Sequence, residues 1–253
     1  MSIKASALRL LKELLRGAGL EVSRVSSPFL RLERLEWLRR HDIRTVIDIG
    51  ANAGQFAALV RNALPDASIY SFEPIADVHA ELVKNMRADA KFTAFPFGLG
   101  EQDEERAINR NEFTPSSSLL PMNSLHQETF PFAVASRKET VSVRRLDDLR
   151  DRMRLEPNVL IKIDVQGYED RVIRGGLQTF REAAVVLMEV GIEPLYEGQW
   201  LFAEMHDALR DLGFDFKGIY GQLLAGDGAP LQADVIFVRD AGTRVPEQGS
   251  VRH

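Results

Sequence analysis

The chain has 253 residues, of which 45% are hydrophobic and 27% charged, with a formal net charge of −5 and an isoelectric point of about 5.6. This length suits one α/β domain with additions, and the acidic balance argues against a protein that binds nucleic acid. The absence of cysteine excludes disulfides, zinc–thiolate sites and cysteine nucleophiles.

Two helical patterns come first in the chain. Residues 5–16 place leucines at helical spacing, and a second run extends from Phe29 to Arg40 after Pro28. We expect residues 1–42 to form a helical cap on the core; the alternative is a membrane-surface helix, or a helix that joins two copies into a homo-oligomer. No apolar run reaches the roughly 20 residues that span a bilayer, and no signal peptide is evident, so we expect a cytoplasmic protein without a transmembrane segment.

Residues 43–240 alternate short β-rich runs with helical patterns, which is typical of a doubly wound, mostly parallel α/β sheet. The runs "VLIKIDV" and "AVVLMEV" are nearly continuous apolar segments, as expected for strands buried on both faces. We expect strands at residues 45–49, 68–74, 91–99, 159–165, 184–190, 215–221 and 233–239, the last two as an antiparallel pair. Helices are expected at residues 53–64, 75–86, 168–180 and 205–212.

One long polar segment, residues 109–138, interrupts this alternation and is dotted with prolines. Insertions of this kind in compact domains tend to be functional lids or disordered. We therefore expect a lid insertion here, in which Ser116, Ser117 and Ser118 could bind hydroxyl groups of a substrate. After Asp240, residues 241–253 are polar and are expected to form a flexible tail.

The stretch "TVIDIGANAGQF" places Asp48, Gly50, Asn52 and Gly54 between a strand and a helix. Ligands of open α/β sheets bind at such carboxyl ends of strands, beside helix N-termini, and glycines let the backbone approach them closely. The next strand ends in Phe72 and Glu73. Because Glu73 lies 23 residues after Gly50, its carboxylate is placed to accept hydrogen bonds from both hydroxyls of a ribose.

Two nucleotide classes fit a loop of this kind. Dinucleotides favour G-x-G-x-x-G, but here the spacing is G-x-N-x-G, and Asp48 is a poor neighbour for a pyrophosphate. S-adenosylmethionine (SAM) instead offers an ammonium, a carboxylate and a ribose. Asp48 would face the ammonium or order the loop, N–H groups of the loop would take the carboxylate, and Glu73 would take the ribose. SAM is therefore the predicted cofactor, and strand-end capping by Asp48 and Glu73 is the alternative.

Three stretches, "VIDIGANAGQF", "SFEP" and above all "LIKIDVQGYEDRVIRGG", resemble FkbM-type methyltransferases, and the resemblance covers residues 43–239. It implies the class I methyltransferase fold, a Rossmann-like sandwich around a seven-stranded sheet. It also implies methyl transfer from SAM, usually to a hydroxyl on a sugar or secondary metabolite. The chain departs from the family pattern at Gln166, where a glutamate is typical; a neutral amide keeps hydrogen bonding but loses a charge, which argues against this position as a base or metal ligand.

The last of these motifs also carries the candidate catalytic residue. Alternation along the strand puts Lys162, Asp164 and Gln166 on one side, and Asp164 stands at the carboxyl end, where the sulfonium methyl is expected. A hydroxyl acceptor has to lose a proton, so we predict that Asp164 acts as the base or contacts the cofactor. The alternative is that Asp164 hydrogen-bonds loop amides and only shapes the site.

Further candidates surround this residue. Lys162 needs a carboxylate partner in a buried strand, for which Glu189 and Glu169 are the predicted candidates. Glu189 could also reach the acceptor, and His126 in the expected lid is a second candidate base. Gly98 and Leu99 follow the third strand, where this fold usually contacts adenine. No cluster of histidines and carboxylates indicates a metal site.

The predicted function is thus SAM-dependent O-methylation of a small-molecule or glycosylated acceptor, such as a sugar, a glycolipid or a secondary metabolite. One alternative is an NAD-dependent oxidoreductase, against which the missing G-x-G-x-x-G, with Asn52 in place of its second glycine, and Asp48 argue. The other is a methyltransferase fold kept as a non-catalytic binding or scaffold protein, which the departure at Gln166 leaves open.

Overall fold

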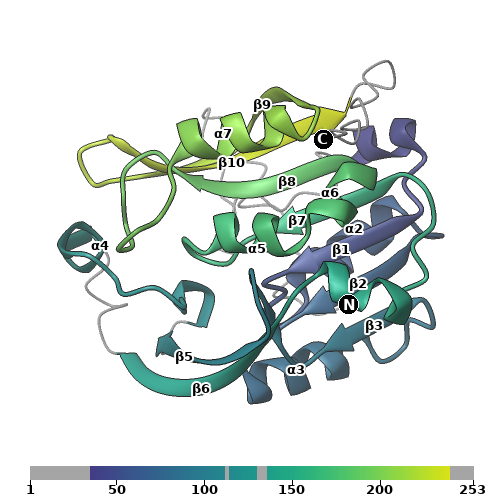
Figure 1. The fold of residues 1–253 in the computed structure, drawn as a ribbon, viewed down its shortest axis with the longest axis horizontal. Helices are drawn as coiled ribbons and strands as arrows, with labels where there is room; N and C mark the ends of the chain where they lie inside the picture. Colours follow the sequence, from purple (N-terminus) through teal and green to yellow (C-terminus); the bar gives the residue numbers. More distant parts are fainter. Residues whose placement is uncertain (1–34, 112–113, 130–135, 240–253) are drawn as a thin grey trace, which may run out of the picture.

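The computed structural model of the chain describes residues 35–111, 114–129 and 136–239 (Figure 1). Most of the expected N-terminal cap lies outside the described residues, as does the expected tail over 241–253. Of the second helical pattern, the described part forms the 3-10 helix η2, Glu36–His41. The division at residues 42 and 240, and the idea of a homo-oligomer built through the N-terminal helices, therefore stay predictions.

A seven-stranded sheet forms the centre of the molecule, with the strand order β3-β2-β1-β7-β8-β10-β9. Strand β10 is antiparallel to both of its neighbours, and all the other pairs are parallel. This confirms the expected doubly wound, mostly parallel sheet with an antiparallel pair at the end of the chain. The strands are β1 Thr45–Ile49, β2 Ser68–Phe72, β3 Phe92–Phe95, β7 Val159–Ile163, β8 Ala183–Gly191, β9 Phe214–Leu224 and β10 Pro230–Arg239.

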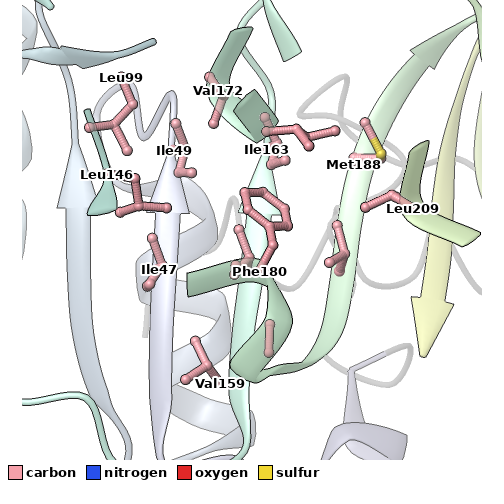
Figure 2. Packing of buried hydrophobic residues seen from close by; sticks show 14 of the residues in the cluster. Ile47, Ile49, Leu99, Leu146, Val159, Ile163, Val172, Phe180, Met188 and Leu209 are labelled. Atoms are coloured by element: carbon pink, nitrogen blue, oxygen red, sulfur yellow. The ribbon is translucent and has the colours of Figure 1, made fainter. Parts of the chain in front are cut away.

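Helices cover both faces of this sheet and bury an apolar layer on each. On one face η2, α2 and α3 pack through side chains such as Phe56, Val60 and Leu82. On the other face lie η5, α5, α6 and α7, and Figure 2 shows Phe180 of α6 in the middle of this second layer. The helices are α2 Gln55–Ala63, α3 Ala76–Met86, η5 Asp147–Arg152, α5 Glu169–Gly175, α6 Leu177–Glu182 and α7 Phe202–Asp211.

The expected helix over 168–180 is two short helices that meet at Gly175 and Gly176. A Cβ atom at Gly175 would lie 1.8 Å from the carbonyl oxygen of Gly100, so only glycine allows the helix to approach the chain this closely. The glycine pair at the end of the motif is therefore a packing requirement.

The expected strand over 91–99, interrupted by Pro96, is two strands that belong to different sheets. Pro96 lacks a backbone N–H and ends β3, after which Gly98–Leu99 forms β4 in a second sheet. That sheet has the order β4-β6-β5, and its strands β5 Glu104–Asn111 and β6 Ser136–Arg144 pair antiparallel.

The lid expected without regular structure at residues 109–138 is thus carried on a β-hairpin. Between β5 and β6 the described residues form the 3-10 turn η3, Thr114–Ser116, and the short helix α4, Ser124–Thr129. Figure 1 shows this hairpin beside the large sheet rather than within it. The two strands escaped prediction because most of their residues are charged or polar, and only Ile108, Val141 and Val143 are buried apolar side chains.

Candidate active site

The loop after β1 is held tightly between its two neighbouring strands. Gly50, Asn52 and Gly54 have positive φ values of 76°, 47° and 89°. A Cβ atom at Gly50 would lie 1.8 Å from the carbonyl oxygen of Asp164, so the loop touches the end of β7 directly. On the other side, the N–H groups of Gly50 and Ala51 donate to the carbonyl oxygen of Phe72 over 3.1 and 3.0 Å.

The remaining N–H groups of this loop are also bonded within the protein. Asn52 donates to Glu73, Ala53 donates to the side-chain oxygen of Asn52, and Gly54 donates to the carbonyl of Ala51. That N–H groups from Gly50 to Gly54 bind the carboxylate of SAM stays a prediction. Their role in the structure is to fix the loop.

Glu73 is the carboxylate that lies beside this loop, and it is 5% exposed. Its Oε2 accepts from the N–H of Asn52 over 3.0 Å and its Oε1 from the N–H of Ile75 over 2.9 Å. Each oxygen keeps a further lone pair. Burial raises the pKa of Glu73 to about 7, although these two hydrogen bonds act in the opposite direction.

A cavity lies at the carboxyl ends of β1, β2 and β7, and its empty space, counted together with the open solvent at its mouth, is about 680 Å³. Seven residues predicted for the cofactor line it: Gly50, Asn52, Phe72, Glu73, Gly98, Leu99 and Asp164. The two others, Asp48 and Gly54, do not. Asp48 is 0% exposed beneath the cavity floor, and a Cβ atom at Gly54 would meet Leu82 at 2.8 Å on the other side of the loop.

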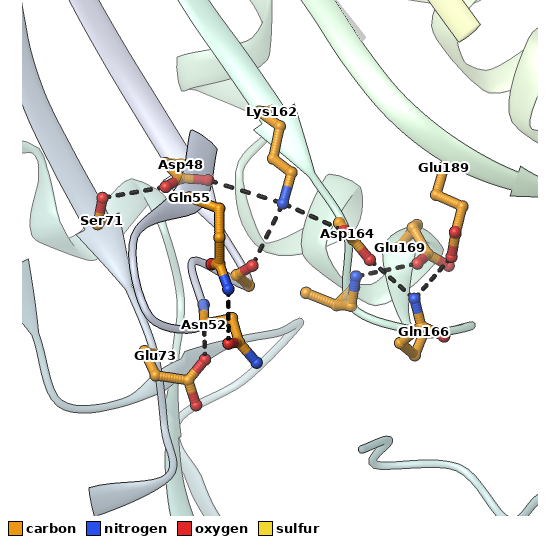
Figure 3. Close-up of polar contacts among 12 residues, drawn as sticks. Asp48, Asn52, Gln55, Ser71, Glu73, Lys162, Asp164, Gln166, Glu169 and Glu189 are labelled. Atoms are coloured by element: carbon orange, nitrogen blue, oxygen red, sulfur yellow. Dashed lines mark hydrogen bonds and ion pairs between the residues drawn. The ribbon is translucent and has the colours of Figure 1, made fainter. Parts of the chain in front are cut away.

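Lys162 connects Asp48 to Asp164 (Figure 3). Its Nζ atom lies 3.7 Å from Oδ1 of Asp48 and 3.3 Å from Oδ2 of Asp164, and it donates to the carbonyl oxygen of Gly50 over 3.2 Å. Burial acts to lower the pKa of Lys162, but the carboxylates of Asp164 and Asp48 outweigh it and raise that pKa. The predicted partners Glu189 and Glu169 were wrong, because the side chain of Lys162 turns toward β1 and away from β8.

Asp48 has two partners and no access to the cavity. Its carboxylate accepts from the hydroxyl of Ser71 over 3.1 Å and pairs with Lys162, both direct neighbours on adjoining strands. Burial raises the pKa of Asp48, and Lys162 opposes that rise. Asp48 does not line the cavity, and its role, whether it orders the loop or faces an ammonium, stays a prediction.

Gln166 occupies the centre of a second polar cluster. Its Nε2 donates to Oδ1 of Asp164 over 2.8 Å and to Oε2 of Glu189 over 2.7 Å. Glu189 also accepts from the amide of Gln232 over 2.8 Å. Burial raises the pKa of Glu189 well above its usual range, and the nearby charges of Asp164 and Asp234 add to that rise.

Two further residues complete this cluster on the side of the lid. The hydroxyl of Tyr196 donates to Oε1 of Gln166 over 2.8 Å and lies 3.3 Å from Nε2 of His126. His126 is 3% exposed and does not line the cavity. Burial lowers the pKa of His126 and raises the pKa of Tyr196 well above its usual value. Tyr196 was not predicted, since a single tyrosine in a loop carries no pattern.

The segment between β5 and β6 closes one side of the cavity through Thr114, Pro115, Ser117 and Leu119. Two side-chain contacts attach it to the site. The amide of Asn52 donates to the hydroxyl of Thr114 over 3.1 Å, and the hydroxyl of Ser118 donates to the carbonyl oxygen of Gln166 over 2.6 Å. Of the three serines singled out in the sequence, Ser117 lines the cavity and Ser118 holds the motif loop.

The sheet order and a cavity at the carboxyl ends of its strands define a class I methyltransferase fold. The sequence model of the family described as "Methyltransferase FkbM domain" matches residues 48–216, and the chain belongs to this family. It is a methyltransferase, and SAM is its methyl donor. Family membership argues against the NAD-dependent oxidoreductase.

Among curated proteins, 2-O-methyltransferase NoeI of Sinorhizobium fredii is 28% identical over 193 residues, which are 71% of this chain and 77% of NoeI. AMB antimetabolite synthetase AmbE of Pseudomonas aeruginosa is 27% identical over 215 residues, 72% of this chain but only 10% of AmbE. The chain therefore spans about a tenth of that longer relative.

Solved methyltransferase structures are similar at a greater distance. Magnesium protoporphyrin IX methyltransferase ChlM of Synechocystis PCC 6803 aligns with a TM-score of 0.46 and 11% identity over 92% of this chain and 96% of ChlM. A putative O-methyltransferase of Klebsiella pneumoniae aligns with a TM-score of 0.47 and 12% identity over 92% and 90% of the two chains. The fold assignment rests on the strand order of this chain.

The cavity offers groups that suit SAM. Carboxylate oxygens of Glu73 have lone pairs that ribose hydroxyls could use, apolar side chains of Phe72, Ile75 and Leu99 would suit an adenine ring, and the carboxylate of Asp164 could attract a sulfonium. In the described part of the chain, no three carboxylate or imidazole groups come together as ligands for a metal ion. No helix among the described residues is long and apolar enough to cross a membrane.

Proposed function

We propose that the chain transfers the methyl group of SAM to a hydroxyl oxygen of a small or glycosylated acceptor. The observation that carries this proposal is the position of Asp164. Its carboxylate is 39% exposed, lines the cavity at the end of β7, and is held by Lys162 on one oxygen and Gln166 on the other. A carboxylate fixed in this way is suited to take a proton from an approaching hydroxyl. The relative NoeI, named as a 2-O-methyltransferase, supports oxygen as the accepting atom.

In this proposal the cofactor occupies the cavity and contacts the predicted cofactor-binding residues that line it. Glu73 binds the ribose hydroxyls, and Phe72, Gly98 and Leu99 border the adenine. Asp48 does not contact the cofactor. With Ser71 and Lys162 it fixes the ends of the strands, so that the loop from Gly50 to Gly54 keeps its shape around the amino-acid end of SAM.

The transfer itself is an in-line displacement. The acceptor oxygen forms a bond to the methyl carbon while the bond from that carbon to sulfur breaks, and the electron pair stays on sulfur. The acceptor proton passes to Asp164, and the products are a methyl ether and S-adenosylhomocysteine. Alignment of the acceptor oxygen, the methyl carbon and the sulfur supplies most of the rate acceleration, because SAM carries its own leaving group.

Glu189 and His126 take lesser parts. Glu189 lies behind Gln166 rather than on the cavity wall, and His126 lies behind Tyr196. Neither contacts the space in which an acceptor hydroxyl would meet the sulfonium. We therefore place both of them in support of Asp164, and the lid residues Thr114 and Ser117 beside the acceptor.

A tritium-transfer assay tests this function against the non-catalytic alternative. Methyl-labelled SAM is incubated with a panel of sugars, glycolipids and hydroxylated metabolites, and binding of SAM is measured separately by calorimetry. Transfer to a hydroxyl with wild-type protein, lost in Asp164→Asn, supports the proposal. Tight binding of SAM with no transfer to any acceptor class favours the scaffold, and transfer to nitrogen would overturn O-methylation.

A further inference from the structure

The side chain of Gln166 can have only one orientation in this structure. Its two N–H donors are used by Asp164 and Glu189, and its carbonyl oxygen accepts from Tyr196. If the amide were reversed, its oxygen would face the carboxylate oxygen of Asp164 at 2.8 Å, and both of these atoms are acceptors. The hydroxyl of Tyr196 therefore selects the orientation in which the amide bridges the two acids.

The backbone of Gln166 is held independently of its side chain. Its φ of 55° lies in the left-handed region, and its carbonyl accepts from Ser118. On either side, the N–H groups of Val165 and Gly167 both donate to Oε1 of the buried Glu169 over 3.2 and 3.1 Å. With the main chain fixed at these points, the remaining freedom is rotation of the amide itself, and the contact with Tyr196 restrains it.

The hydrogen bond from Tyr196 to Gln166 also determines which nitrogen of His126 carries a hydrogen. A phenol has one proton, and Tyr196 donates it to Gln166, so its oxygen can only accept at the 3.3 Å contact with Nε2 of His126. Nε2 of His126 then has to carry a hydrogen. Burial lowers the pKa of His126, which keeps the imidazole neutral with a single N–H, and burial raises the pKa of Tyr196, which keeps the phenol protonated.

We propose that Tyr196 and His126 are positioning residues for methyl transfer, which orient the amide of Gln166 so that it holds Asp164 and Glu189 in place. Asp164 touches the reacting groups, whereas Tyr196 and His126 act only through Gln166. The amide bridges two acids without bringing a charge of its own. A glutamate at position 166 would instead place a third carboxylate between two others, and repulsion would be relieved only by a shared proton.

The first test needs no acceptor and so is independent of the proposed function. Protein labelled with ¹⁵N-histidine contains five histidines, and the resonances of His126 are assigned by their absence in His126→Gln. We expect His126 in the Nε2–H tautomer at neutral pH, and we expect Tyr196→Phe to shift its ring nitrogens. Tyr168→Phe is the matched control, because Tyr168 is 2% exposed in the same apolar cluster but its hydroxyl lies near Glu104.

Kinetics of the purified variants provide the second test, which does rest on the proposed function. With the acceptor found by tritium transfer, Tyr196→Phe and His126→Leu should lower the single-turnover rate roughly 10- to 100-fold, the range for a slightly misplaced reacting group. Affinity for SAM should change less than about twofold, since neither residue lines the cavity. His126→Gln, which keeps an N–H donor, should recover most of the rate, and Tyr168→Phe should match wild type.

Gln166→Glu supplies a signature that a merely structural residue would not give. Because burial raises the pKa of Glu189, that acid can share a proton with the new carboxylate at neutral pH, so the rate should stay near wild type there and should fall at higher pH as the shared proton is lost. The proposal is overturned if His126 is the Nδ1–H tautomer, if Tyr196→Phe leaves the His126 resonances unchanged, or if folded Tyr196→Phe transfers methyl groups at the wild-type rate. If neither wild type nor any variant methylates an acceptor, the proposed function fails. The tautomer of His126 and its response to Tyr196→Phe then still decide whether the contacts from His126 through Tyr196 to Gln166 exist.

Discussion

Lys162 and Asp48 are direct neighbours across strands β7 and β1, and Nζ of Lys162 lies 3.7 Å from a carboxylate that is 0% exposed. Lys162 is the only cation in the described part of the chain that pairs with Asp48. The same ammonium also holds Asp164 at the cavity. One lysine therefore links the stability of the sheet to the position of the proposed base.

Removing this ammonium should be costly. We expect Lys162→Met to lower the free energy of unfolding by roughly 3–5 kcal/mol, because it leaves a buried carboxylate without its countercharge. The penalty should shrink as the pH falls: an acid whose folded-state pKa is raised stabilises the fold at low pH, and this contribution is lost as the pH rises. Urea unfolding at several pH values measures both effects. Lys217→Met is the control, since Lys217 pairs with Asp215 at the surface; equal losses in the two variants would contradict the assignment.

Binding of the cofactor should depend on the proton of Glu73. The pKa of Glu73 is about 7 in the free protein, and hydrogen bonds from ribose hydroxyls favour its charged form. Binding then releases protons near pH 7, and affinity falls by up to roughly tenfold per pH unit below the pKa. Calorimetry with S-adenosylhomocysteine, in two buffers of different ionisation enthalpy, measures the release. Glu73→Gln should bind more weakly and lose this dependence; a wild-type affinity that is constant from pH 6 to 8 would count against ribose binding by Glu73.

Alanine substitutions at three glycines distinguish the cost of a steric clash from the cost of backbone strain. Gly50→Ala should destabilise by more than about 3 kcal/mol, because its Cβ would lie 1.8 Å from the Asp164 carbonyl at a positive φ. Gly228→Ala combines a φ of 88° with open space and should cost about 1–2 kcal/mol. Gly226→Ala has neither problem and should stay within about 0.5 kcal/mol. Thermal unfolding ranks the three variants, and a Gly50→Ala protein as stable as Gly226→Ala would disprove the contact with β7.

Asp164→Asn should separate chemistry from binding. We expect its fold and affinity for SAM to stay nearly intact while the methylation rate falls by roughly 10²–10⁴, the range for loss of a general base. Asp170→Asn is the control, since Asp170 is buried but pairs with Arg171 and Arg174 away from the cavity. Affinity lost in step with rate would show that Asp164 organises the site instead.

The segment between β5 and β6 should respond to ligands. We expect protease cleavage within residues 109–138 to slow when cofactor and acceptor are both bound, because its contacts through Thr114 and Ser118 border the cavity. Thr114→Val removes the acceptor for the Asn52 amide and should speed cleavage of the free protein. Cleavage at the same rate with and without ligands would identify a fixed structural insertion.

The sequence alone predicted the large sheet well, for a physical reason. Strands buried on both faces are nearly continuous apolar runs, so β1, β7 and β8 were recognisable, and amphipathic spacing marked α2 and α3. The loop at Gly50 and the acid at Glu73 were also predicted, because a strand followed by glycines and a helix places ligands at the strand ends. The structure gathers these residues around one cavity, and their roles there stay predictions.

The remaining features depend on contacts that spacing does not encode. Strands β5 and β6 pair with each other through mostly polar residues, so no apolar alternation revealed them. Alternation placed Lys162 on the correct side of its strand, but its choice of Asp48 over Glu189 follows from cross-strand register. Tyr196 and His126 meet across 70 positions of sequence, and only the folded chain brings them together.

The hairpin that carries the lid pairs with β4 alone and adds no strand to the large sheet. Mutations in the connection between β5 and β6 therefore leave the hydrogen-bond ladder of the cofactor site untouched. Selection on acceptor choice can then act on Ser117 and Leu119, which line the cavity, whereas Thr114 is tied to the loop after β1 through Asn52. Within this family, sequence differences that change the acceptor are expected to concentrate in this connection. Exchanging the connection alone between reconstructed ancestral proteins would then transfer the preference for one acceptor to the other protein.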